Sequence, residues 1–218
     1  SGTSTICTGS DIGGSIRIPA STCGLVGYKP PYGRNPEEAI FNLDFYCHTG
    51  PLARSVKDTI RLQNVMCGPS PKDIASLRPK LVLPYEYKPI KDWKIAYSPN
   101  LGCFEVDPEV EKNTLASLEV FKSLGATIEE VDLGWGPEVL EAGLAYLGHI
   151  FGAAMQDELE QHADKLTSYT RAFAEESLNS TPRDFLGSLD VAYQMYSTLG
   201  PILEEYNVLI CPTTAIPA

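Results

Sequence analysis

The chain has 218 residues, of which 43% are hydrophobic, and this content is enough to build the core of one domain. Its formal net charge of −11, with scattered Lys and Arg, disfavours direct nucleic-acid binding because phosphate backbones repel it. No apolar run approaches the roughly 20 residues of a membrane-spanning helix, and the first residues lack a signal-peptide pattern. We therefore expect a soluble protein with no membrane contact.

Six cysteines are spread along the chain without a C-x-x-C pair. A chain of this length does not need disulfide bonds to hold its core together. We therefore expect reduced thiols in a cytoplasmic protein.

The first third of the chain is dominated by small residues and prolines. Residues 1–33 are rich in Gly, Ser and Thr, which predicts backbone that is held in turns or approached closely by another group. Residues 54–66 predict a helix that Gly68 ends. Prolines interrupt any pattern after it, so we interpret residues 69–92 as a surface connection.

A strand–helix–strand pattern follows this connection. Residues 94–98 form a short strand candidate, and Asp107 followed by Pro108 is a typical helix start. The helical period continues until Gly125, after which residues 127–133 alternate as a strand does. This order of elements is typical of an α/β layer.

The remaining part is expected to be mostly helical. Residues 138–176 read as helix, Thr181 caps another helix, and residues 208–211 form a buried strand. We assign residues 93–218 to an α/β and helical part, and the whole chain, 1–218, to a single domain.

The run Gly13-Gly14-Ser15 has a physical reading before any family is considered. Two glycines let successive N–H groups converge on one point, and converging donors stabilise the oxyanion of an acyl-transfer reaction. The same turn would present the Ser15 hydroxyl to that point. For such a tripeptide alone, an ordinary glycine-rich turn with Ser15 as a hydrogen-bonding turn residue is the favoured interpretation.

Two other kinds of glycine-rich functional site, a phosphate-binding loop and the nucleophile elbow of Ser-His-Asp hydrolases, fit this sequence less well. No phosphate-binding pattern G-x-x-x-x-G-K-[ST] or G-x-G-x-x-G occurs, and the serine does not lie in a G-x-S-x-G nucleophile elbow. The histidines give no base or metal ligand set, because His48 is expected in a loop and His149 and His162 in separate helical stretches.

The longer run GSDIGGSIRIP at residues 9–19, followed by CGLVGYKP at 23–30, closely resembles the amidase-signature family motif. Many ordered positions match at once. The resemblance covers the whole chain with a less distinctive middle at about 134–181, and it continues through residues 48–58, 106–110 and 209–214.

The resemblance implies an α/β fold with a mixed β-sheet covered by helices, present here in part. It also implies a Ser-cisSer-Lys triad whose nucleophile falls on Ser15. The implied oxyanion hole consists of the backbone N–H groups of Ile12, Gly13, Gly14 and Ser15. We expect side chains at Gly13 and Gly14 to be obstructed.

The family's cis-serine and lysine match no position in this chain, which begins after them. We therefore expect an internal or C-terminal fragment of a longer amidase that is inactive by itself. Lys29 matches a structural lysine of the family and is not interpreted as the base.

Asp11 and Arg17 flank the nucleophile segment. They could pair with each other or bond to backbone amides and so fix the loop's shape. The apolar and glycine residues around them predict that both side chains are buried, as supports and not as proton-transfer groups.

The predicted activity is hydrolysis of a small-molecule carboxylic amide to a carboxylate and ammonia or an amine, with no cofactor and no metal. A homodimer is compatible with this reading. The glutaminase-type subunit of a tRNA-dependent amidotransferase is one alternative, although residues 32–38, YGRNPEE, depart from the pattern expected of it. A non-catalytic amidase-like binding module is the other, and retention of Ser15 argues against it.

Overall fold

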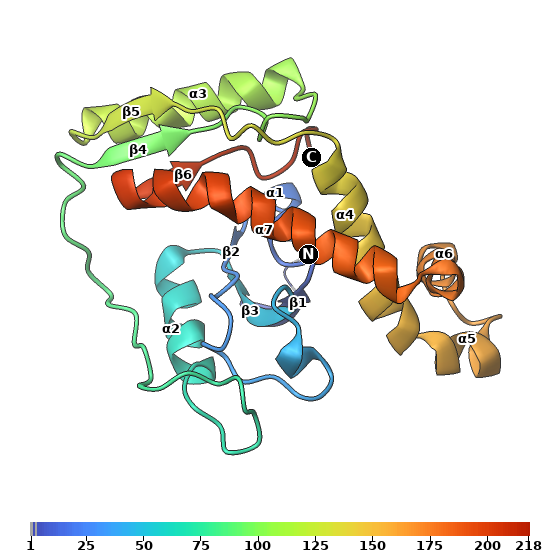
Figure 1. Ribbon diagram of the computed structural model, residues 1–218. Helices are drawn as coiled ribbons and strands as arrows, with labels where there is room; N and C mark the ends of the chain where they lie inside the picture. The colour runs from blue at the N-terminus through green and yellow to red at the C-terminus, as the bar shows by residue number, and fades with distance from the viewer. Residues whose placement is uncertain (1, 3) are drawn as a thin grey trace. The chain divides into compact units, whose positions relative to one another are not determined.

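The computed structural model describes residue 2 and residues 4–218 (Figure 1). These residues fall into two compact units. The first unit contains the residues up to Pro89 together with Asp107–Val110 and Thr213–Ala218, and the second contains Ile90–Val106 and Glu111–Pro212. The boundary after Pro89 lies inside the connection predicted for residues 69–92. The assignment of residues 1–218 to a single domain stays a prediction.

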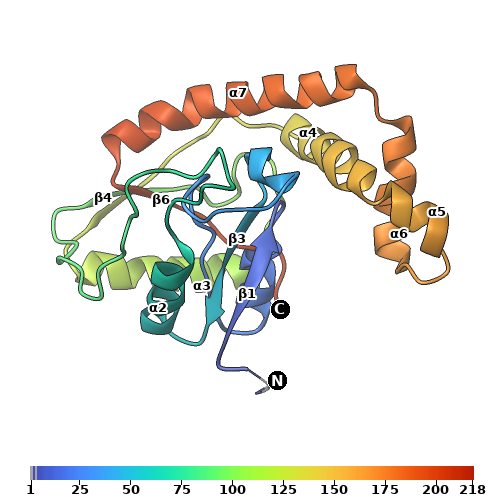
Figure 2. The same cartoon turned by 90° about the horizontal axis from the view of Figure 1, so that it is seen from below.

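The first unit is built on a three-stranded antiparallel sheet in the order β1-β3-β2. These strands are β1 (Ile6–Asp11), β2 (Val26–Gly27) and β3 (His48–Ala53), and the short helix α1 (Arg17–Thr22) lies between β1 and β2 in the chain. Figure 2 shows β1 beside β3, and every residue of β1 has a partner in β3. The sequence predicted only turns here, because the small residues of β1 carry no alternation of apolar and polar side chains.

Ile16 anchors the segment after β1 to this sheet. Its side chain is fully buried and packs with Ala20 and Leu52. Glycines make room for it, since a Cβ on Gly27 would lie 2.9 Å from the Ile16 carbonyl oxygen and one on Gly50 would lie 3.0 Å from Ile16 Cδ1. The glycine-rich strands therefore create the socket that receives Ile16.

Helix α2 (Val56–Met66) packs against the same sheet. Ser55 caps it by accepting a hydrogen bond from the Asp58 N–H, as expected of a helix start. Two buried amides, Asn35 and Gln63, bond each other reciprocally, and Asn35 also donates to the Thr49 carbonyl at 2.8 Å. The segment before β3, which contains the short turn η1 (Phe41–Leu43), is thereby tied to the sheet.

The second unit contains a parallel sheet in the order β5-β4-β6. Its strands are β4 (Lys94–Tyr97), β5 (Thr127–Glu130) and β6 (Val208–Ile210), and α3 (Pro108–Ser123) connects β4 to β5. The predicted strand–helix–strand order is confirmed, and with two sheets and helices the chain is α/β. The central strand β4 is the most buried, because it has neighbours on both sides.

The helical region predicted from residue 138 onward is also confirmed. Helix α7 begins after Thr181, whose side chain accepts from the Asp184 N–H while Asp184 bonds back to the Thr181 N–H. Among the described residues, no helix is both long and apolar enough to cross a bilayer. The elements are α4 (Glu138–Leu147), the π-helical turn η2 (Gly148–Gly152), α5 (Gln156–His162), α6 (Ser168–Glu176), η3 (Ser177–Asn179) and α7 (Pro182–Glu205).

Candidate active site

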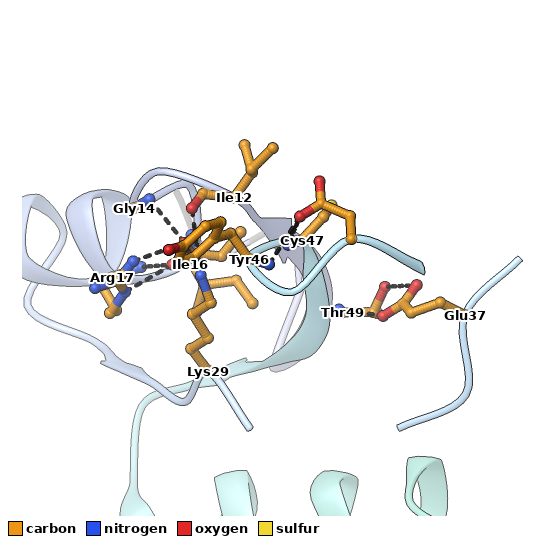
Figure 3. A network of polar contacts seen from close by, with 11 residues as sticks. Ile12, Gly14, Ile16, Arg17, Lys29, Glu37, Tyr46, Cys47 and Thr49 are labelled. Atoms are coloured by element: carbon orange, nitrogen blue, oxygen red, sulfur yellow. Dashed lines mark hydrogen bonds and ion pairs between the residues drawn. The ribbon is translucent and has the colours of Figure 1, made fainter. Parts of the chain in front are cut away.

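The Asp11 carboxylate at the end of β1 organises the loop that carries Ser15. Asp11 is fully buried. Its Oδ1 accepts a hydrogen bond from the Gly14 N–H at 2.7 Å. Its Oδ2 accepts from the N–H groups of Ile16 at 3.2 Å and Arg17 at 3.3 Å. The loop therefore wraps around a single carboxylate, as Figure 3 shows for the labelled Gly14, Ile16 and Arg17.

Two cations complete the coordination of Asp11. Arg17 donates from Nε at 2.9 Å and from Nη2 at 2.8 Å, which is a bidentate pair, and Lys29 Nζ lies 3.2 Å from Oδ1. The predicted burial is correct for Asp11 but wrong for Arg17, whose side chain is 47% exposed. A guanidinium group is wide enough to bind a buried carboxylate with one edge while its other edge faces solvent.

The carboxylate remains ionised in this buried position. Burial by itself would raise the pKa of Asp11, but the hydrogen bond from Arg17 and the charge of Lys29 outweigh it. They hold the pKa of this carboxyl well below its ordinary value of 3.8. Burial also lowers the pKa of the Lys29 ammonium group, a shift that the charge of Asp11 opposes.

Ser15 lies exposed in a turn, two residues before α1. In the described part of the chain, the N–H groups of Ile12, Gly13 and Ser15 make no hydrogen bond, so three of the four predicted donors are available to an acceptor. Gly14 departs from the four-donor prediction, because its N–H is directed to Asp11 in this conformation. The Asp11 carboxylate thus shapes the loop and also accepts a hydrogen bond from one of the four predicted oxyanion donors.

The two glycines before Ser15 differ in their structural requirements. Gly14 has a φ of +115°, and a Cβ there would lie 2.6 Å from Ile18 Cδ1. A side chain is therefore obstructed at Gly14, as predicted. The same prediction is wrong for Gly13, where an added Cβ meets nothing within 4 Å. The backbone conformation at position 14 requires glycine. At position 13 the protein itself leaves room for a side chain, so a requirement for glycine there would have to come from a bound molecule.

The histidines of the described residues are not part of a metal-binding group. His48 begins β3, opposite Asp11 in the register, and is buried, so its predicted place in a loop is wrong. Burial lowers its pKa. His149 in η2 bonds Ser180 at 2.8 Å and stacks on Phe185, as a packed histidine does. Within residue 2 and residues 4–218, no three His, Cys, Asp or Glu side chains form a metal-binding group.

Sequence reasoning missed a second polar contact of the first unit, which lies between Glu37 and β3. Glu37 Oε2 accepts from the Thr49 hydroxyl at 2.9 Å, and its other oxygen accepts from the Thr49 N–H. Thr49 pairs with Ser10 of β1, so this contact lies next to Asp11 in the sheet register. Figure 3 places Glu37 and Thr49 on the opposite side of the network from Gly14. One indirect sign of this contact is present in the sequence: residues 32–38, which contain Glu37, depart from the pattern expected of a glutaminase-type subunit.

Comparison with known proteins places these residues in context. The family model described as Amidase matches residues 1–218. An acylamidase of Rhodococcus erythropolis is 32% identical over 216 residues, which are 96% of this chain and 45% of that protein. An amidase of Pseudomonas putida is 30% identical over 98% of this chain and 47% of its own length. The chain therefore spans about half the length of the curated relatives it matches.

Two further similarities concern another activity and the fold. A glutamyl-tRNA(Gln) amidotransferase subunit of Marinobacter nauticus is 29% identical over 97% of this chain and 49% of its own length. The crystal structure of a bacterial aryl acylamidase superposes with a TM-score of 0.88 at 25% identity, covering 98% of this chain and 46% of that one. Because the family match extends over every residue, the chain belongs to the amidase-signature family.

Proposed function

We propose that this chain is part of an amidase that hydrolyses a carboxylic amide through an acyl-serine intermediate on Ser15. The observation that carries the proposal is the loop around Asp11, which holds an exposed serine beside three unbonded backbone N–H groups. A nucleophile and preorganised oxyanion donors in one rigid turn are the two requirements of acyl transfer.

The proposed reaction has two steps. Ser15 Oγ attacks the amide carbon and loses its proton, and the oxyanion is stabilised by the N–H groups of Ile12, Gly13 and Ser15. The C–N bond then breaks, the amine leaves with a proton, and the acyl group remains as an ester on Ser15. Water hydrolyses this ester to the carboxylate and restores the hydroxyl. Ser-cisSer-Lys chemistry would move the protons, as the family resemblance implies.

Lys29 is not proposed as the lysine of this triad. Its ammonium group is directed to the Asp11 carboxylate and to the Ile12 carbonyl oxygen, so its donors are engaged by acceptors other than Ser15. A general base must instead be able to accept the proton of Ser15. The lysine and the cis-serine would therefore come from other residues of the full-length protein.

We propose a small-molecule amide as the substrate, on the basis of the relatives named as an acylamidase and an amidase. The alternative of a glutaminase-type subunit rests on the relatives named as glutamyl-tRNA(Gln) amidotransferase subunits. The exposed Ser15 favours an enzyme over a non-catalytic binding module. A cytoplasmic location and a homodimer stay predictions.

The test compares the full-length protein with its Ser15→Ala variant. Wild type should hydrolyse simple aliphatic or aryl amides and be labelled covalently on Ser15 by a fluorophosphonate. Ser15→Ala should lose both properties, with turnover reduced roughly 10⁶-fold if this nucleophile behaves as other catalytic serines do. Turnover that survives in Ser15→Ala would refute the proposal.

The same assay separates the two amide-cleaving activities. A panel of aryl acylamides, aliphatic amides and free glutamine is given to the full-length protein, and released ammonia or amine is measured. An amidase should cleave the simple amides without any partner. The amidotransferase alternative would be supported if glutamine were the one substrate of the panel that is cleaved and if its cleavage required a partner protein.

A further inference from the structure

Lys29 binds two different groups of the nucleophile loop. Its Nζ lies 3.2 Å from Asp11 Oδ1 and 3.3 Å from the carbonyl oxygen of Ile12. Its side chain is only 17% exposed, and it lies between β2, which ends at Gly27, and the fully buried Pro30. The ammonium group is thus held by the sheet and not by the loop that it contacts.

The bond to the Ile12 carbonyl also fixes the direction of an N–H group. In a trans peptide the C=O of one residue and the N–H of the next point in opposite directions. When Lys29 holds the Ile12 oxygen on the inner side, the Gly13 N–H must point outward. The next peptide has the reverse orientation, because Asp11 draws the Gly14 N–H inward.

We propose that Lys29 is a positioning residue that turns the Gly13 N–H toward the oxyanion of the reaction. The inference rests on the proposed amidase function and deepens it. Asp11 and Lys29 divide the task, since the carboxylate collects the amides that must point inward and the ammonium group fixes the one that must point outward. The open space around Gly13 leaves that donor accessible to an approaching substrate.

The first test is kinetic and uses the full-length enzyme. Lys29→Met should lower kcat by about 100-fold, the effect of losing one oxyanion donor, and leave KM within about threefold. Lys29→Arg keeps a cation that can bond the Ile12 oxygen and should recover most of this loss. A kcat within twofold of wild type in folded Lys29→Met would overturn the proposal.

Arg17→Met is the matched control. It removes the other cation from Asp11 and leaves the Lys29–Ile12 bond in place. If Lys29 acted only through the charge of Asp11, the two variants would lose similar fractions of kcat. We expect the loss in Arg17→Met to be at least about tenfold smaller, because the Gly13 donor stays aligned. Equal losses would overturn the proposal.

A measurement on wild type keeps the proposal testable if Lys29→Met does not fold. Amide hydrogen exchange at Gly13 is compared before and after a fluorophosphonate labels Ser15, because the phosphoryl oxygen of the adduct stands in for the oxyanion. Exchange at Gly13 should slow roughly tenfold or more on labelling. Labelling of Ser15 without protection of Gly13 would refute the role of Lys29 and leave the proposed function standing. Absence of labelling would instead count against the function itself.

Discussion

The two units of this chain achieve their structure by different means. The second unit is a parallel sheet with connecting helices, and its elements follow from apolar periodicity and helix caps. The first unit is an antiparallel sheet of small residues, in which one buried carboxylate and one buried isoleucine fix the loop that carries Ser15. The comparison teaches that the loop carrying Ser15 is held by contacts that its sequence pattern does not reveal, whereas the helices and strands of the α/β layer are marked by local sequence signals, although its strands also pair over long distances in the chain.

The largest difference between the units is expected at their aspartates. Asp11→Asn would place an amide N–H₂ against donors and leave Lys29 and Arg17 without a carboxylate, which should destabilise the protein by about 3 to 5 kcal/mol. Asp184→Asn, at the exposed start of α7, should destabilise it far less, because water solvates this side chain. Urea unfolding of both variants checks this. Equal losses would contradict the view that Asp11 organises the first unit.

Two buried isoleucines give the next comparison. Ile16→Ala and Ile95→Ala each remove a side chain that is at most 1% exposed, so each should lower the free energy of unfolding by about 2 to 5 kcal/mol. Ile16 follows Ser15, the proposed nucleophile, directly in the chain, so we expect Ile16→Ala to lower kcat per folded molecule more than Ile95→Ala does. The number of active molecules is measured by titration with a fluorophosphonate, and the measured rate is divided by that number. A matching loss of kcat in Ile95→Ala would remove the distinction.

The two glycines sharpen the comparison within the loop. Gly14→Ala should lower stability by about 1 to 3 kcal/mol, because alanine is strained at a φ of +115° and its Cβ meets Ile18. Gly13→Ala should change stability by less than about 1 kcal/mol, because its Cβ would meet no atom within 4 Å, and any larger effect should fall on turnover. Thermal unfolding and kcat are measured for both. A stable Gly14→Ala variant would refute the required backbone conformation.

The pH dependence of stability tests the ionised Asp11. Its pKa is lower in the folded than in the unfolded state, so its stabilisation is fully present above the ordinary value of 3.8 and is lost as the pH falls below it. One such group changes stability by at most about 1.4 kcal/mol per pH unit. Unfolding is measured between pH 5 and 3 in wild type and Asp11→Asn. The variant should lack this part of the acid dependence, and identical profiles would contradict the assignment.

The smallest effect is expected at the cap of α7. Thr181→Ala removes the side chain that accepts from the Asp184 N–H and should destabilise the protein by about 1 kcal/mol. The cap bond acts only on the first turn of α7, so we expect kcat to stay unchanged. A thermal melt and a single rate measurement suffice. A large loss of turnover would show that this helix start influences the reaction.

The sequence by itself determined the elements whose signals are local. The helix start at Asp107 and Pro108, the Thr181 capping box and the alternating strand after Gly125 each depend on residues close together in the chain. The structure places these elements where they are predicted, with the strand confined to Thr127–Glu130. The same holds for the family, because the ordered run around Ser15 is a linear motif. The sequence also predicts that Asp11 supports the loop, because Asp11 lies four residues before Ser15.

Only the tertiary structure decided how the loop is held. The pairing of β1 with β3 joins segments about forty residues apart, and their small residues give no periodic signal. Lys29 reaches Asp11 and Ile12 across 17 or 18 residues. The hydrogen bond from Lys29 to the Ile12 carbonyl fixes the peptide plane between Ile12 and Gly13. The Gly14 N–H, one of the four predicted oxyanion donors, is instead bonded to Asp11. Directions of hydrogen bonds depend on the position of the acceptor in space, and a linear motif does not contain that position.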